Sequence, residues 1–170
     1  MALLEILLEG DPRLRQKSTK IRAVDASVRK LAADLRETMM EAPGVGLAAP
    51  QVGVNRRLFV AHVPADFVEE GDQEFNLTLV NPEIVKGHGR VIALEGCLSI
   101  PGWVADVPRF ETITVKGLDL NNRDVRLKLT GYPARVVQHE IDHLDGILYT
   151  DRIEDMSTLR RADEDDEDAA

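Results

Sequence analysis

The sequence predicts an α+β fold, a single domain in which short, mostly antiparallel strands pack around a central helix carrying the residues HEIDH, with another helix nearer the N-terminus. Three observations support this prediction. The length of 170 residues suits one domain with its own core. Two segments have apolar residues at helical spacing, and between them lie short β-branched stretches bounded by turn residues.

The chain is expected to begin with a strand and a helix. Residues 1–14 start with an apolar stretch, but two glutamates and the lack of a basic segment argue against a signal peptide and favour a strand of the mature fold. Asp25 can then cap a helix that ends before Pro43. The apolar positions of this helix recur every three or four residues, at Val28, Leu31, Leu35 and Met39.

The middle of the chain is expected to be rich in strands. The segment GVGLAAPQVG at 44–53 has three glycines and a proline, which suits a loop or an edge segment. Asn121 and Asn122 tolerate left-handed backbone angles and suit a hairpin turn between two of the strands. The stretches that predict strands are 57–62, 78–80, 84–85, 90–94, 112–118 and 125–129.

A second helix is predicted from Pro133 to about Gly146, because proline is accepted in the first turn of a helix. Helical spacing divides it into two faces. One face is apolar and contains Val137, Ile141, Leu144 and Leu148. The other contains Val136, His139, Glu140 and His143. This division predicts a helix that is well buried on one side only.

The charge of the chain argues against a nucleic-acid partner. The formal net charge is −9, but six acidic residues lie at 163–168, and without them it is −9 + 6 = −3. Tight binding to a phosphate backbone needs clustered lysine and arginine, so no DNA partner is expected. No apolar run approaches the roughly 18 residues that a membrane span requires, so no membrane association is expected either. The single cysteine, Cys97, excludes an internal disulfide and fits a reducing cytosol.

The strongest chemical signal is the sequence His139-Glu140-Ile141-Asp142-His143. Two histidines four residues apart on a helix direct both imidazole rings to one point, and the glutamate between them lies beside it. This arrangement suits two metal–nitrogen bonds with a general base close by. The alternative is a pair of surface histidines beside a salt bridge on the helix face.

A metal site with two histidines needs a third protein ligand, and its identity separates the possible classes. The metzincin pattern requires a third histidine at position 149, which holds Tyr149. A gluzincin would use an acidic ligand downstream of the motif. The candidates are Asp151, Glu154 and Asp155, but the chain around them is too short for a gluzincin-type subdomain. Cys97 is the remaining soft ligand, although a lone cysteine is more often an inert core residue.

Three motifs, in order, resemble the peptide deformylase family: GVGLAAPQ at 44–51, EGCLS at 95–99 and QHEIDH at 138–143. The resemblance includes DPRLR at 11–15 and extends to about Ile153. It implies a catalytic domain at 1–155, and the acidic composition of the remaining residues, 156–170, predicts a disordered tail. It also implies one divalent metal ion per chain held by Cys97, His139 and His143, with Fe(II) in the cell and zinc, nickel or cobalt in purified protein.

The resemblance implies a metal-dependent hydrolase that removes the N-formyl group from the N-terminal formyl-methionine of newly synthesised polypeptides. Hydroxide would attack the formyl carbon, and Glu140 would act as general base and then protonate the leaving amine, so that formate is released. The Leu98 backbone N–H and the Gln51 side-chain amide would stabilise the oxyanion. Main-chain groups at Gly44, Val45 and Gly46 would pair with the substrate as an added strand.

Further residues are assigned by the same resemblance. Val136 would contribute to an apolar pocket for the methionine side chain. Glu95 and Arg109 are expected to form an ion pair near the site that orients Gln51, and the alternative is a surface pair without consequence. The acidic C-terminus would be repelled by ribosomal RNA, so any transient ribosome association would not use a basic C-terminal helix. The lack of a transit peptide favours the bacterial cytoplasm.

Two other functions remain open at this point. A zinc metallopeptidase of another HExxH class shares the helix motif but does not use a cysteine ligand. A non-catalytic metal-binding module would close the site with four protein ligands.

Overall fold

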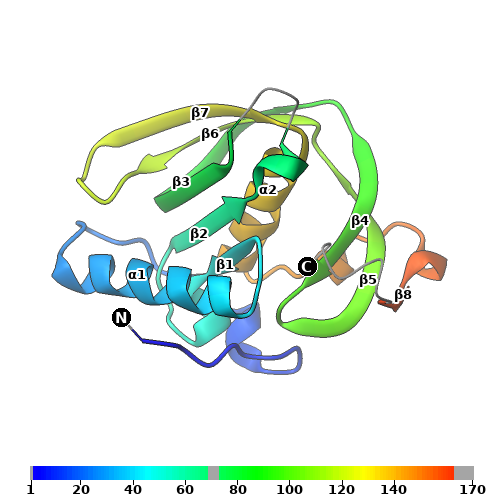
Figure 1. The fold of residues 1–170 in the computed structure, drawn as a ribbon, viewed down its shortest axis with the longest axis horizontal. Coiled ribbons are helices and arrows are strands. Elements are labelled where there is room, and N and C mark those ends of the chain that lie inside the picture. Colours follow the sequence, from blue (N-terminus) through cyan, green and yellow to red (C-terminus); the bar gives the residue numbers. More distant parts are fainter. Residues whose placement is uncertain (1, 69–72, 163–170) are drawn as a thin grey trace.

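The computed structural model describes residues 2–68 and 73–162, and within these it has two α-helices and two antiparallel β-sheets (Figure 1). The helices are α1 (Ala26–Glu41) and α2 (Gly131–Leu144). The larger sheet has the order β1-β2-β3-β6-β7, with β1 (Gly46–Ala48), β2 (Leu58–Val63), β3 (Phe75–His88), β6 (Thr112–Leu118) and β7 (Asp124–Thr130). The smaller sheet has the order β4-β5-β8, with β4 (Val91–Cys97), β5 (Ile100–Arg109) and β8 (Arg160–Arg161). The predicted α+β class is confirmed.

The helix α1 agrees with its prediction. The Asp25 side chain accepts a hydrogen bond from the Val28 amide at 3.1 Å and so caps the first turn. The helix ends at Glu41, two residues before Pro43. Its apolar face is buried against β1 and β2, in a cluster that includes Val28, Leu35, Met39, Leu47, Leu58 and Val60.

The helix α2 lies in the middle of the molecule, between the two sheets (Figure 1). Every residue from Pro133 to Leu144 is buried, so the prediction of a helix buried on one side only is wrong. The reason is that the apolar residues of the helix pack on the larger sheet, while Arg135, His139 and Asp142 make hydrogen bonds to β4 and β5. The helix ends before Gly146, whose φ of +75° and close approach to the Arg15 carbonyl leave no room for a Cβ.

The hairpin between β6 and β7 was predicted, whereas β5 was not. Asn122 has a φ of +59° in the turn, and the Asp119 amide donates to the Arg123 carbonyl at 3.0 Å. In β5, Pro101 and Pro108 interrupt the β-branched pattern from which strands are recognised. Pairing with β4 along most of its length nevertheless holds it as a strand.

The N-terminal segment is extended but forms no strand between residues 2 and 8, so the predicted first strand is wrong. Its amides donate to the side chains of Asp34 and Thr38 on α1 and to the carbonyl groups of Gln51 and Ser99. Its hydrogen-bond partners are thus the surface of α1, the 3-10 helix Ala49–Val52 and the turn between β4 and β5, rather than the edge of a sheet. The last two of these segments carry residues of the site.

The ordered chain continues past the expected boundary at residue 155. A short 3-10 helix spans Met156–Thr158, and β8 pairs with Trp103 and Val104 of β5. The Ala162 amide donates to the Gly102 carbonyl at 2.9 Å. The predicted start of a disordered tail at residue 156 is therefore wrong, because these residues complete the smaller sheet. The acidic residues 163–168 lie outside the described residues.

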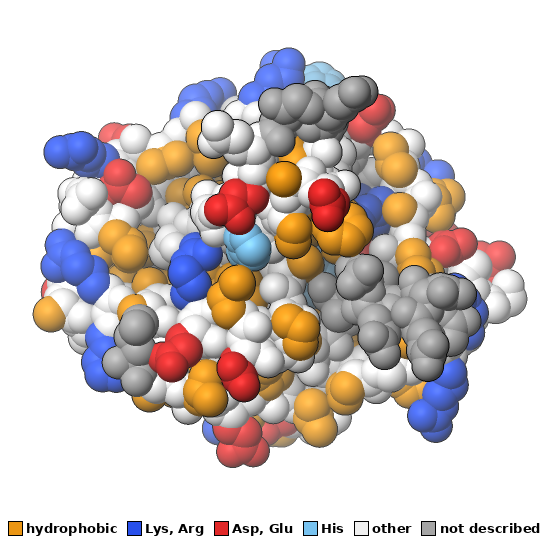
Figure 2. Space-filling model, viewed as in Figure 1, with side chains coloured by type: hydrophobic (Ala, Val, Ile, Leu, Met, Phe, Trp, Pro, Cys, Tyr) orange, Lys and Arg blue, Asp and Glu red, His pale blue; other side chains and the backbone are white. Residues whose placement is uncertain are grey.

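Figure 2 shows one face of the molecule, on which acidic, basic and hydrophobic side chains are intermixed. On that face the charges are not separated by sign. Among the described residues, neither helix combines the length and apolar character needed to cross a membrane.

Candidate active site

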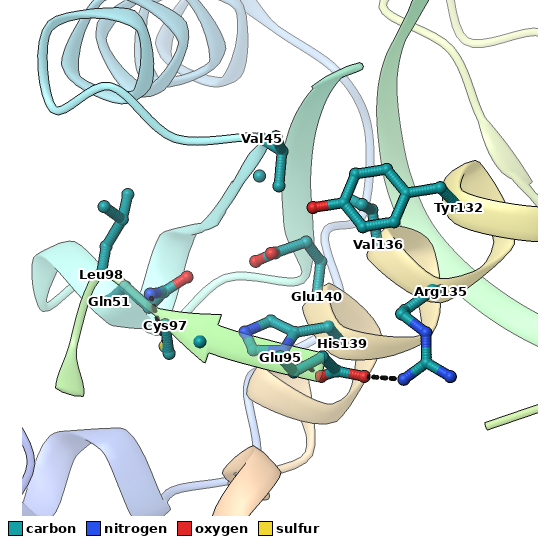
Figure 3. A pocket seen from close by; sticks show the side chains of 12 residues that line it. Val45, Gln51, Glu95, Cys97, Leu98, Tyr132, Arg135, Val136, His139 and Glu140 are labelled. Atoms are coloured by element: carbon teal, nitrogen blue, oxygen red, sulfur yellow. Dashed lines mark hydrogen bonds and ion pairs between the residues drawn. The ribbon is translucent and has the colours of Figure 1, made fainter. Parts of the chain in front are cut away.

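A pocket that is open to solvent lies where β1, β4 and α2 meet (Figure 3). Three separate parts of the chain line it. The first supplies Val45, Gly46 and Gln51, the second Glu95, Gly96, Cys97 and Leu98, and the third Tyr132, Arg135, Val136, His139 and Glu140. The fold therefore brings most of the residues predicted from the three motifs to one cavity.

Cys97, His139 and His143 form a group whose ligand atoms all lie within 4.8 Å of one another. The Cys97 Sγ is 3.3 Å from the His143 Nε2, and the two histidine Nε2 atoms are 3.2 Å apart. Four-coordinate zinc bond lengths give expected separations of about 3.6 Å for sulfur to nitrogen and about 3.3 Å for nitrogen to nitrogen. A thiolate and two imidazoles at these distances fit one tetrahedral metal ion.

Glu95 orients the His139 ring, and burial keeps His143 neutral. The His139 Nδ1 lies 2.9 Å from the Glu95 carboxylate. A proton on Nδ1 makes this hydrogen bond, which leaves the Nε2 lone pair directed at the site. Burial lowers the pKa of His143 well below its usual value, and so keeps that ring neutral.

Glu140 points into the pocket from α2 (Figure 3). It is buried, and within the described residues its Oε1 has no hydrogen-bond partner. Burial raises the pKa of Glu140 to about 7. A Cβ added at Gly46 would lie 2.4 Å from the Glu140 Oε2. A side chain at this position would therefore displace the carboxylate, a constraint that the sequence did not show.

The Gln51 amide is held in one orientation by two neutral partners. Its Oε1 accepts from the Ala48 amide at 3.0 Å, and its Nε2 donates to the Ser99 hydroxyl at 3.1 Å. The same Nε2 lies 3.8 Å from the Cys97 Sγ. The amide N–H₂ group thus faces Cys97, one of the three clustered candidate ligands. Leu98 directly follows Cys97, in the turn that joins β4 and β5.

The ion pair of Glu95 and Arg109 is buried, with side chains only 5% and 4% exposed, so the alternative of a surface pair is wrong. Two hydrogen bonds of 2.9 Å join the two side chains. Burial alone would raise the pKa of Glu95, but hydrogen bonds from Arg109 and His139 hold it well below its usual range. The predicted orientation of Gln51 by this pair is wrong, because the pair contacts His139 instead.

The remaining predicted residues also lie at the pocket or beside it. Val45 and Val136 are part of its lining. Gly44 precedes β1, and a Cβ there would come within 2.6 Å of the Leu98 side chain. Both glycines of the 44–46 segment are thus positions where side chains of the site approach the backbone.

Sequence reasoning missed several residues of the site. Tyr132 and Arg135 line the pocket, and the Tyr132 ring lies 5.9 Å from that of Phe67. Asp142 accepts a hydrogen bond of 2.6 Å from Arg109. A signal was available for Arg135, because it lies one helical turn before His139 and so shares its face.

Comparison with known proteins agrees with this geometry. Residues 3–159 match the model of the polypeptide deformylase family. The chain is 59% identical to the peptide deformylase of Thermomicrobium roseum over 170 residues, which covers 100% of this chain and 97% of that protein.

Solved structures show the same fold. The peptide deformylase from Ehrlichia chaffeensis in complex with actinonin is 38% identical, with a TM-score of 0.85, and the match covers 93% of this chain and 92% of that one. The Met-Ala-Ser-bound class I type b peptide deformylase from Acinetobacter baumannii is 34% identical, with a TM-score of 0.82 and coverage of 89% and 98%. The predicted enzyme class, a metal-dependent hydrolase with deformylase function, is confirmed. The chain belongs to the polypeptide deformylase family.

Proposed function

We propose that this enzyme removes the formyl group from the N-terminal formyl-methionine of newly synthesised polypeptides and releases formate. The observation that carries the proposal is the convergence of Cys97, His139 and His143 beside the buried carboxylate of Glu140, at a pocket open to solvent. The related protein from Acinetobacter baumannii was solved with Met-Ala-Ser, a peptide that begins with methionine. A substrate of this kind would place its N-terminal residue in the pocket.

One divalent metal ion would be held by Cys97, His139 and His143. When bound, the ion lowers the pKa of a water molecule toward neutrality and so supplies a hydroxide nucleophile. A cysteine and two histidines suit iron, zinc, nickel and cobalt. We propose Fe(II) as the ion in the cell, with the other three as possible occupants of purified protein.

Glu140 would move the protons of the reaction. Its carboxylate is buried and directed into the pocket, beside the backbone of β1. It would accept a proton as the nucleophile attacks the formyl carbon and deliver one to the leaving amine as the carbon–nitrogen bond breaks. The restricted space beside Gly46 would keep the carboxylate in the orientation that this transfer needs.

Two donors would stabilise the oxyanion that develops on the formyl oxygen. One is the Gln51 Nε2, which Ala48 and Ser99 hold facing Cys97. The other is the Leu98 backbone N–H. Because such donors are fixed before the reaction begins, each contributes about 3 kcal/mol to transition-state stabilisation in well-studied hydrolases.

The substrate backbone would add to the free edge of the larger sheet. In the part of the chain that the structure describes, β1 is one of the two edge strands of that sheet and pairs only with β2. Val45 and Gly46 line the pocket and Gly44 precedes them, so an extended peptide could pair with the main-chain groups of this segment. The apolar side chains of Val45 and Val136 would then surround the methionine side chain.

The Gly46→Ala variant is expected to lower kcat at least tenfold. The added methyl group would lie 2.4 Å from the Glu140 Oε2, so the carboxylate must leave its position. Steady-state kinetics with a formylated tripeptide measures the effect, and thermal unfolding measures the accompanying strain. In the Glu140→Ala background the same substitution should cost less stability, because the clashing group is gone. An unchanged kcat would contradict the assigned contact.

The proposed activity is tested by anaerobic purification, metal analysis and a formate-release assay on formyl-Met-Ala-Ser. We expect about one divalent ion per chain, release of formate, and no cleavage of the internal peptide bonds. Cleavage of internal bonds would instead favour a metallopeptidase of another HExxH class. Metal binding without any hydrolysis would favour a non-catalytic metal-binding module.

The setting of the reaction follows from its substrate. Newly synthesised polypeptides are met at the ribosome, and we propose that the enzyme acts there transiently, in the bacterial cytoplasm. The acidic residues 163–168 would be repelled by ribosomal RNA, so any docking would not use a basic C-terminal helix.

A further inference from the structure

The three proposed metal ligands come from elements that belong to different apolar clusters. Cys97 on β4 packs with Ile100, Ala105 and Val107 of β5. The apolar residues of α2, which carries His139 and His143, pack with the larger sheet instead. Hydrophobic burial therefore holds α2 against the larger sheet. The junction between α2 and the β4–β5 hairpin, where the metal site lies, is polar.

Arg135 crosses this junction from the helix to the hairpin. Its side chain is 7% exposed, and its Nη1 donates to the Glu95 Oε2 at 2.5 Å. The same nitrogen donates to the Val107 carbonyl at 2.8 Å, and Nη2 donates to the Val91 carbonyl at 2.8 Å. One guanidinium thus binds a side chain on β4 and the main chain of both β4 and β5. Arg109 crosses in the opposite direction, from β5 to α2.

The carboxylate of Glu95 is saturated by these contacts. Its Oε1 lies 2.9 Å from both the Arg109 Nη2 and the His139 Nδ1. Its Oε2 accepts from the Arg109 Nε at 2.9 Å and from Arg135. A carboxylate has about four lone-pair positions, so all of them are used. Loss of the Arg135 contact would free one position and leave Arg109 and His139 as the remaining partners, so the carboxylate would hold His139 less firmly.

We propose that Arg135 is a positioning residue, which fixes the metal ligand His139 through Glu95 and sets the distance between α2 and Cys97. The inference rests on the proposed metal site. Groups that hold a metal ligand from behind commonly change metal affinity by about 10–100-fold when they are lost. Arg135 acts one contact further away than such a group, so the expected change lies at the lower end of this range.

The alternative is that Arg135 only stabilises the fold, and Arg152 provides a matched control. Arg152 donates to Asp142 at 3.1 and 3.0 Å and belongs to the same set of ion pairs. It makes no hydrogen bond or ion pair with Glu95 in the described structure, and its side chain is 47% exposed. Replacing either arginine removes one positive charge near the site. Only the change at position 135 removes a hydrogen bond to Glu95.

The test uses the full chain loaded with Co(II), in wild-type form and as Arg135→Met, Arg135→Lys, Arg152→Met and Arg152→Lys. Metal affinity is measured by competition with a chelator, and the ligand geometry by the visible absorption bands of Co(II). We expect Arg135→Met to weaken binding about tenfold and to shift these bands. Arg135→Lys should show a smaller effect in the same direction, because a lysine amine cannot reach Glu95 and both carbonyl groups together. Both Arg152 variants should match the wild type.

Steady-state kinetics adds a second measurement. A disturbed metal site should lower kcat more than it raises KM, whereas a change confined to the pocket wall should act on KM. Wild-type affinity and wild-type bands in folded Arg135→Lys, or equal changes in the Arg152 variants, would overturn the proposal. If the wild-type protein itself binds no Co(II), the proposed metal site fails instead, and the two failures are distinguishable.

Discussion

The Glu140→Ala variant is expected to lose formate release by about a thousandfold or more while it keeps one metal ion per chain. The carboxylate is not among the three atoms that converge on the metal position, so its removal leaves the ligand set intact. The Glu140 carboxylate is directed into the pocket next to the metal position. The other carboxylate of the pocket lining, Glu95, is already bound by two arginines and His139. No other group in the described structure is placed to take over the proton transfer.

Metal analysis and kinetics on the same preparation check this expectation. Glu83→Ala is a suitable control, because Glu83 lies on β3 with its side chain 65% exposed and pairs only loosely with Lys116 at 3.7 Å. Removing the buried charge of Glu140 should leave the thermal midpoint unchanged or raise it, since burial disfavours the ionised form. A Glu140→Ala protein that retained a tenth of the wild-type kcat would refute the assigned role.

The Cys97→Ser variant is expected to bind metal more than about 100-fold more weakly, which corresponds to about 2.7 kcal/mol. A serine hydroxyl has nearly the same size as a thiol, but it stays protonated at neutral pH and is a poor ligand for these ions. Cys97 is only 4% exposed and packs in a cluster with Ile100 and Leu148, so the substitution changes ligand chemistry more than packing. Formate release should fall with the metal content.

Thermal unfolding separates this effect from misfolding. A ligand that binds only the folded state raises its stability, so added metal should raise the Tm of the wild type but not of Cys97→Ser. Without metal, the two proteins should unfold at similar temperatures. His62→Ala is a matched control, because His62 pairs with Glu74 outside the site. Full metal content in Cys97→Ser after dialysis would show that another group completes the ligand set.

The parts of the site that could be predicted from the sequence are those that local geometry decides. His139 and His143 lie one helical turn apart, so helix formation alone brings their rings to one point. Asp25 and Pro43 marked the limits of α1 for the same reason, since capping and helix termination involve neighbouring residues. Cys97 is distant in the chain from both histidines, and only the resemblance of the three motifs connected it with them.

Other features were decided by packing between distant segments. Gly46 looked like a glycine of a loop or a peptide-binding edge, but its position against Glu140 depends on how β1 meets α2. Gln51 was expected to be oriented by Glu95 and Arg109, yet its partners are Ala48 and Ser99. Apart from the one with Ala48, these contacts join residues from segments that are distant in the chain, so the spacing of residues in the sequence cannot predict them.

The sequence by itself determined the helix motif, the order of the three motifs and the enzyme class that they indicate. The tertiary structure decided what surrounds them. It buried α2 on both faces, and it placed Arg135 and Arg109 across the polar junction between that helix and the β4–β5 hairpin. The physical reason is the distance along the chain over which each kind of interaction acts. Helical spacing acts over a few residues, whereas the saturation of the Glu95 carboxylate needs side chains from β5 and α2 to meet on β4.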